Sequence, residues 1–354
     1  MEFTLSEEQT LFQDSVARFL EDDHRFEDRP KRMAEPHGYL TAHWQHFAEM
    51  GWLALPLPES AGGLGGSMID TWVLMEQMGR GLVVSPYVST VVGAGRLLAD
   101  VGRGEAEQIS EGELKVALAL GGAVQLSNQK LDGVVNVVEF AGDMDGFVVE
   151  ARENTDPVLV YISAKANGLS IEAARTIDGG SAGQLTFSGV EIGEGDVIAR
   201  GEAGSKAILE AQQRCNAALI AEASGLMWAA YETTLDYVKT RKQFGETLGS
   251  FQTVQHRLVD CYTKCQFATS AALDAAWAVD RAKPDAATHI SGAKYLVGEY
   301  ARSVLQEAIQ LHGGMGVMRE MPLGAYYARS IVIDSLFGDG RSHLKAVYQH
   351  LQES

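Results

Sequence analysis

The chain has 354 residues, of which 46% are hydrophobic and 21% charged, and this composition predicts a globular protein rather than a disordered or fibrous one. At about 150 residues per domain, the length indicates two or three domains. The net charge of −18 argues against a general nucleic-acid binder, because such a protein needs a basic face.

Three cysteines are too few for a disulfide framework. Cys261 and Cys265 share one face of an expected helix, and without further ligands nearby they are predicted to be buried apolar residues rather than metal ligands. The N-terminal segment lacks the basic start and apolar stretch of a signal peptide, and no run of about 18 apolar residues predicts a membrane span. We therefore expect a cytoplasmic protein with no membrane partner.

Residues 1–112 are predicted to form an N-terminal α-helical domain. Ser6 and Gln9 have the spacing of a capping box at the start of a first helix. A second helix is expected around Trp44–Met50. Glycines and prolines between Leu55 and Gly66 indicate a loop.

Residues 113–200 are predicted to form a middle β domain. Short apolar or alternating runs such as Val134–Phe140 and Gln184–Phe187 recur there, separated by Gly, Asn and Asp. This spacing is typical of a compact antiparallel sandwich or barrel.

Residues 201–354 return to long helical periodicity and are predicted to form a C-terminal four-helix bundle. The whole chain is thus an α+β multidomain protein. A short last helix follows four long ones, which are expected at roughly 203–240, 250–282, 285–312 and 320–336.

The segment from Arg241 to His256 carries the most chemistry. Arg241 and Phe244 end one expected helix, a turn follows, and Gln252 begins the next helix. An arginine can bind a phosphate through its planar fork, and a helix N-terminus favours anions. A helix end with a favourable arginine and a glycine cap explains the same residues without any ligand.

The second segment is the glycine-rich run Gln310–Val317 at the end of an expected helix. Its paired glycines, Gly313 and Gly314, allow a ligand to approach the backbone closely, although a simple helix-ending turn also uses glycine. The run lacks the strand and the G-x-G-x-x-G spacing of a dinucleotide fingerprint.

Together the two segments resemble the acyl-CoA dehydrogenase family of flavoproteins. The pattern R-K-x-F-G…F-Q-x-V-Q-H-x-L-x-D matches Arg241–Asp260, and Q-L-H-G-G-M-G-V matches Gln310–Val317. Further matches are Pro58–Gly65, Arg175–Asp178 and Phe187–Val190. The resemblance covers essentially the whole chain, which is similar to the small subunit of the pimeloyl-CoA and steroid-CoA heteromeric types.

This resemblance implies an N-terminal helical domain, a β domain and a four-helix bundle that builds a tetramer. It also implies FAD as cofactor, an acyl-CoA thioester as substrate and an electron-transfer flavoprotein as acceptor. A carboxylate base would remove the α-proton while a hydride leaves the β-carbon for the flavin. His256 and His312 would be supporting or interface groups rather than catalysts. The residues implied to contact the FAD of a neighbouring subunit, with Arg241 on the pyrophosphate, are Arg241, Phe244, Gln252, Gln310, Gly313 and Gly314.

The β region departs from the family pattern where the flavin ring should be held. The family's Thr-Glu-Pro…Gly-Ser-Asp-like loop is replaced by a shortened Ala117–Val124, and the next flavin strand reads Val134–Phe140. The groups that would hold an isoalloxazine ring from the same subunit are therefore largely absent.

The usual glutamate base is missing as well. Gly338 occupies its position after the fourth bundle helix, Asp339 follows one step later, and Cys215 occupies the alternative position on the first bundle helix. A general base must reach its proton before its pKa matters. Asp339 is either a displaced base or a loop and cap residue, whereas Cys215 is expected to be a packing residue.

We therefore expect one chain of a hetero-oligomeric, FAD-dependent acyl-CoA dehydrogenase. It would lend FAD contacts in trans to a homologous large subunit, which would hold the flavin ring and the base in an α2β2 tetramer. Three alternatives remain open: a self-sufficient homotetramer with Asp339 as base, flavin-dependent oxygenation on the same scaffold, and a flavin-free structural subunit.

Overall fold

The computed structural model describes residues 4–353, and they form two compact units. The helical unit comprises the chain up to Arg29, Met68–Val83 and the chain from Asn216 onward. The sheet unit comprises Pro30–Ser67 and Val84–Cys215. Within the described part of the chain, no helix is long and apolar enough to cross a bilayer.

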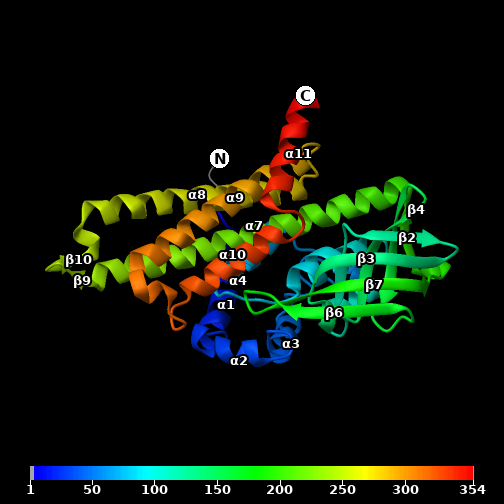
Figure 1. The fold of residues 1–354 in the computed structure, drawn as a ribbon, viewed down its shortest axis with the longest axis horizontal. Coiled ribbons are helices and arrows are strands. Elements are labelled where there is room, and N and C mark those ends of the chain that lie inside the picture. Colours follow the sequence, from blue (N-terminus) through cyan, green and yellow to red (C-terminus); the bar gives the residue numbers. More distant parts are fainter. Residues whose placement is uncertain (1–3, 354) are drawn as a thin grey trace. The chain divides into compact units, whose positions relative to one another are not determined.

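The sheet unit is built on a single eight-stranded sheet (Figure 1). Its strand order is β6-β7-β3-β2-β4-β5-β8, with β1 beside β4. The strands are β1 (Val116–Ala119), β2 (Ala123–Ser127), β3 (Lys130–Glu139), β4 (Gly146–Glu153), β5 (Asp156–Ser163), β6 (Leu169–Arg175), β7 (Ser181–Glu191) and β8 (Val197–Arg200).

Most strand pairs are antiparallel, as the short alternating runs predict. Strand β7 alternates buried and less buried side chains along most of its length, which is typical of a sheet with one face toward a core. The expected antiparallel arrangement does not hold at β4, because β1 and β2 both pair with it in parallel. The β2–β3 hairpin provides the long connection that a parallel pair needs.

Strand β1 is buried along its whole length because helical segments of the same unit cover it. The π-helical turn η3 (Val88–Gly95) supplies the Ser89 hydroxyl that accepts the Leu118 N–H at 3.1 Å. The other helices of this unit are α3 (Thr41–Glu49), α5 (Arg96–Asp100) and α6 (Glu105–Ser110), and α2 (Arg29–Ala34) begins at its boundary.

The helical unit contains the long C-terminal helices and two N-terminal ones (Figure 1). The predicted capping box of α1 is confirmed, with both Ser6 and Gln9 hydrogen bonds formed. The four predicted long helices are also confirmed, within a few residues at each end. The helices are α1 (Glu7–Asp23), α4 (Met68–Arg80), α7 (Gly201–Thr240), α8 (Gln252–Asp280), α9 (Ala286–His312), α10 (Leu323–Ser335) and α11 (Gly340–Glu353). Helix α7 begins in the sheet unit and belongs to the helical unit from Asn216 onward.

A buried ion pair joins α7 to α10 in the core of this unit. Arg329 donates to both carboxylate oxygens of Glu222 at 2.6 and 3.0 Å, and the two side chains are only 3% and 1% exposed. Glu222 is thereby committed to the helical core through its pair with Arg329.

Candidate functional site

A tight hairpin follows the C-terminus of α7. Its two short strands, β9 (Lys242–Gln243) and β10 (Glu246–Thr247), pair antiparallel. The two residues between them, Phe244 and Gly245, both have positive φ, +57° and +88°, as a type I′ turn requires. This turn leaves the Phe244 side chain 91% exposed.

An exposed arginine and an exposed helix N-terminus flank this hairpin. Arg241 precedes the hairpin, and Gln252 is the first residue of α8. Both side chains are exposed, and neither forms a hydrogen bond or ion pair with another residue that the structure describes. No side chain caps the start of α8, so its first backbone N–H groups favour an anion from outside.

The glycine-rich turn at the end of α9 is also open. Gly313 has φ +60° and ψ −137°, a conformation that is accessible essentially only to glycine. A Cβ at Gly314 would meet no atom within 4 Å, whereas one at Gly316 would lie 2.6 Å from the Ile309 carbonyl oxygen. Packing inside the chain therefore explains Gly316 but not Gly314. The Gln310 side chain is exposed and without a hydrogen bond to the described residues.

The structure brings the hairpin and the glycine-rich turn to the same end of the helical unit (Figure 1). Tyr237, one turn before Arg241 on α7, stacks on His312 at the end of α9, with ring centroids 4.2 Å apart. Arg257 of α8 pairs with Glu307 of α9 at 3.1 Å. All six residues expected to contact FAD lie at this end, and all six are exposed.

These groups fit the adenosine-diphosphate half of FAD. A free guanidinium and uncapped helix N–H groups suit a pyrophosphate, and the open backbone at Gly314 leaves room for it. The exposed Phe244 offers a flat apolar surface to a ring system.

The sheet unit offers far less to a flavin ring. The turn between β1 and β2 consists only of Leu120, Gly121 and Gly122, so its side chains carry no donor. A Cβ at Gly122 would lie 2.5 Å from Cγ2 of Val135, and the turn therefore packs directly on β3. The Gly121 N–H is taken by the Glu150 carboxylate at 2.9 Å.

The loop at the position expected for the base is shaped around a glycine. Gly338 has φ +107°, and a Cβ there would lie 2.9 Å from Nε2 of His343. No larger residue fits this backbone without displacing His343. The next residue, Asp339, caps α11: its Oδ1 accepts the Ser342 N–H at 2.8 Å.

The same hydrogen bond from the Ser342 N–H lowers the pKa of Asp339, whose side chain is exposed. A lowered pKa makes a carboxylate a weaker base. The geometry thus gives Asp339 a structural task, while its role as a base stays a prediction.

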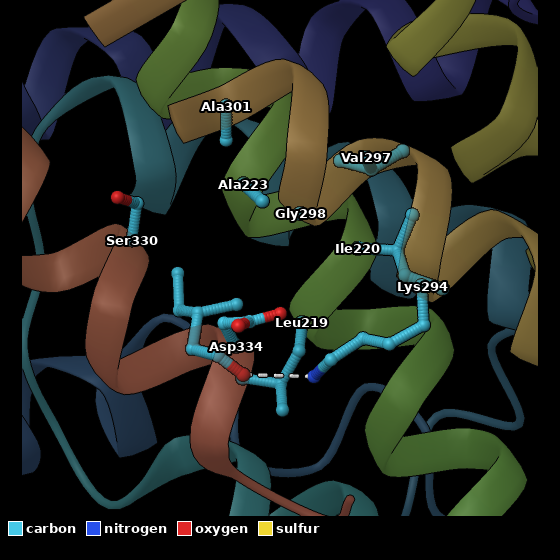
Figure 2. A pocket seen from close by; sticks show the side chains of 10 residues that line it. Leu219, Ile220, Ala223, Lys294, Val297, Gly298, Ala301, Ser330 and Asp334 are labelled. Atoms are coloured by element: carbon cyan, nitrogen blue, oxygen red, sulfur yellow. Dashed lines mark hydrogen bonds between the residues drawn. The ribbon is translucent and has the colours of Figure 1, made fainter. Parts of the chain in front are cut away.

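Buried polar side chains hydrogen-bond to the backbone of this loop and to the end of α10. The Lys294 side chain is 2% exposed, and its ammonium donates to the carbonyl oxygen of Ile333 at 2.8 Å (Figure 2). It also donates to the carbonyl oxygen of Leu336 at 3.2 Å. It thereby satisfies the C-terminal carbonyls of α10. Asn216 donates to the Phe337 carbonyl oxygen at 3.2 Å.

A cavity of about 10 Å³ lies beside Lys294, where α7, α9 and α10 meet (Figure 2). It has room for about one water molecule and is far too small for an acyl group.

The three cysteines are buried, as predicted. Cys215 is fully buried, with its Sγ 3.8 Å from the Val88 carbonyl oxygen. Burial raises the pKa of Cys261 to about 11 and of Cys265 to about 12. Between residues 4 and 353, no group of three or more His, Cys, Asp or Glu side chains is placed to hold a metal ion.

Known proteins share both the sequence pattern and the fold. The chain matches the acyl-CoA dehydrogenase N-terminal domain over residues 6–109 and the acyl-CoA dehydrogenase C-terminal domain over residues 202–352. It therefore belongs to the acyl-CoA dehydrogenase family, whose members are FAD-dependent oxidoreductases of acyl-CoA thioesters.

Two curated relatives cover most of the chain. The acyl-CoA dehydrogenase FadE28 of Mycobacterium tuberculosis is 29% identical over 314 residues, which are 85% of this chain and 89% of that protein. The acyl-CoA dehydrogenase IpdE2 of Mycolicibacterium smegmatis is 28% identical over 345 residues, which are 96% of this chain and 98% of that protein.

Two solved structures of similar fold have descriptions that each name two proteins. A variant of the Tcur3481-Tcur3483 steroid acyl-CoA dehydrogenase has a TM-score of 0.90 at 27% identity, with 99% of each chain covered. The ChsE4-ChsE5 complex of Mycobacterium tuberculosis has a TM-score of 0.91 at 22% identity, with 100% of each chain covered, and shows the same fold.

Proposed function

We propose that this chain is the base-deficient subunit of a hetero-oligomeric acyl-CoA dehydrogenase. It completes the FAD site of a homologous partner subunit, which holds the flavin ring and supplies the base. The enzyme introduces an α,β double bond into an acyl-CoA thioester in the cytoplasm and passes its electrons to an electron-transfer flavoprotein. Two copies of each subunit form the tetramer.

One contrast carries this proposal. The hairpin segment from Arg241 to Gln252 and the turn from Gln310 to Gly314 keep all six residues expected to contact FAD, and all six are exposed. The side chains of Arg241, Gln252 and Gln310 form no hydrogen bond or ion pair with another described residue. The β1–β2 turn and the Gly338 loop keep neither the flavin-ring contacts nor the glutamate. A half-site of this kind is useful only against a second chain that holds the other half.

Each residue of the half-site has a distinct task. The Arg241 guanidinium would hold the pyrophosphate, and the Gln252 and Gln310 amides would supply further hydrogen-bond donors beside it. Gly313 and Gly314 let the backbone approach the nucleotide, and Phe244 packs on it. When bound, FAD supplies the hydride acceptor for desaturation.

Two relatives in the comparison support a heteromeric assembly. Structures similar to this chain include one described as the ChsE4-ChsE5 complex and one described as a Tcur3481-Tcur3483 steroid acyl-CoA dehydrogenase. These descriptions apply to those proteins, and they make a homologous partner of unlike sequence the natural expectation here.

The proposal is tested by substituting Arg241→Ala in a complex with a homologous, glutamate-bearing partner. Losing a charged hydrogen-bonding pair weakens binding by about 10- to 100-fold, so the FAD dissociation constant should rise by that factor. Arg18→Ala, at an exposed arginine of α1, is the matched control and should leave FAD binding unchanged. Equal FAD affinity in both variants would contradict the proposal and favour a flavin-free structural subunit.

A further inference from the structure

The two segments of the proposed half-site are connected through one residue at the end of α7. The Tyr237 carbonyl oxygen accepts the Arg241 N–H at 2.8 Å, which ties the hairpin to this last turn. The Tyr237 ring stacks on His312 with centroids 4.2 Å apart and planes inclined by 20°. The Tyr237 hydroxyl also donates to the Met315 sulfur at 3.7 Å.

His312 is held rigidly in this stack. The side chain is only 3% exposed, and its Nδ1 lies 2.8 Å from the Ala308 carbonyl oxygen. Because a carbonyl oxygen only accepts, Nδ1 carries the proton and Nε2 keeps its lone pair. That Nε2 is buried and has no hydrogen-bond partner among the described residues. His312 is therefore a neutral, fixed ring that stacks on Tyr237 and cannot reach a ligand itself.

The last turn of α7 also supports the hairpin through a neighbouring residue. A Cβ at Gly249 would lie 3.2 Å from the Val238 carbonyl oxygen, so the segment after the hairpin packs directly on α7. The Leu248 N–H donates to the Arg241 carbonyl oxygen at 2.8 Å. One helical turn thus carries the hairpin through Val238 and Arg241, and the glycine-rich turn through Tyr237.

We propose that Tyr237 and His312 are positioning residues that fix the spacing between Arg241 and the Gly313–Gly314 backbone. This inference rests on the proposed function and adds to it. Two segments that bind one nucleotide must be held at a constant separation, because each Å of misplacement lowers the value of their hydrogen bonds. The stack joins the last turn of α7, just before Arg241, to the end of α9, just before Gly313.

Hydrogen exchange of the chain alone tests the connection without any cofactor. His312→Ala removes the stack but touches neither the hairpin nor α8. Aromatic pairs contribute a factor of about two to ten, so exchange at the backbone amides of residues 242–251 should accelerate by about that factor. Tyr237→Leu should act in the same way, and Tyr237→Phe, which keeps the ring, should not. Acceleration confined to residues 310–318 in both His312→Ala and Tyr237→Leu would overturn the inference.

FAD titration of the deflavinated complex with the partner provides the second measurement. His312→Ala should weaken FAD binding by about two- to tenfold, and this loss should largely disappear in the Arg241→Ala background because the residue that it positions is gone. Strictly additive losses would overturn the positioning role alone. If Arg241→Ala itself leaves FAD binding unchanged, the proposed function fails, and the exchange experiment still decides whether the stack connects the segments.

Discussion

Nε2 of His343 lies 2.9 Å from the point where any residue other than glycine at position 338 would place its Cβ. Since Gly338 occupies the position expected for a glutamate base, this contact shows that the loop is adapted to having no side chain there. Restoring a glutamate would require both the backbone and His343 to move.

Gly338→Ala should therefore lower the free energy of unfolding by about 1–3 kcal/mol, through the positive φ and the contact with His343. Urea unfolding of the isolated chain measures the change. Gly324→Ala in α10 is the matched control, because its Cβ would meet no atom within 4 Å. The control should be neutral or stabilise the chain by up to about 1 kcal/mol. Equal effects of the two substitutions would contradict the steric argument.

The free energy of unfolding should decrease at acidic pH because His343 is buried in the folded chain. Burial, together with the Lys294 charge, lowers its pKa to about 4, while Asp339 opposes the shift. The unfolded chain takes up a proton below pH about 6.5, and the folded chain resists this until pH about 4. The contribution of the neutral His343 to the free energy of unfolding is thus complete above pH about 6.5. It is lost as the pH falls, by about 2 kcal/mol between pH 7 and pH 5.

The pH dependence is isolated by comparing urea unfolding of wild type, His343→Gln and His256→Gln at these two pH values. His343→Gln should reduce the loss by about 2 kcal/mol, whereas His256→Gln, at an exposed position of α8, should not. An unchanged difference between pH 7 and pH 5 in His343→Gln would show that His343 does not titrate as the structure indicates.

The buried pair of Glu222 and Arg329 should be costly to break and much less costly to replace. Glu222→Leu alone leaves a buried guanidinium without its carboxylate and should destabilise the chain by about 3–5 kcal/mol. Adding Arg329→Met should recover most of that loss, because both charges are then gone. Thermal and urea unfolding measure these changes. A double variant whose loss of unfolding free energy equals the sum of the two single losses would contradict this account.

The cysteines should be unreactive in the folded chain. All three are buried, and the raised pKa values of Cys261 and Cys265 keep them as thiols. A thiol reagent that detects thiolate should label none of the three quickly at pH 8 and all three in urea. Rapid labelling of one thiol in the native chain would identify an opening that the structure does not show.

Features encoded by local patterns were predictable from the sequence. The capping box at Ser6 and the lengths of α7, α8 and α9 follow from periodicity and from glycine and proline breakers. The alternating residues of β7 likewise predict a strand.

Features that depend on contacts between distant segments were not predictable. The residues around Lys294 carry no local signal that its ammonium caps α10. The π-helical turn η3 likewise lies against β1, where the Ser89 hydroxyl accepts the Leu118 N–H. The parallel pairing of β1 with β4 and the stack of Tyr237 on His312 join residues about 30 and 75 positions apart. Such contacts are set by the packed fold and leave no periodic signal.

The central claim is that this chain holds only one half of an FAD site. The most direct test is the absorption spectrum of the chain purified alone, with flavin quantified per chain, beside the same measurement on the complex with a glutamate-bearing homologous partner. The account predicts little or no flavin in the isolated chain and bound flavin in the complex. One FAD per chain in the isolated protein would contradict it, and would show that the sheet unit holds the flavin ring after all.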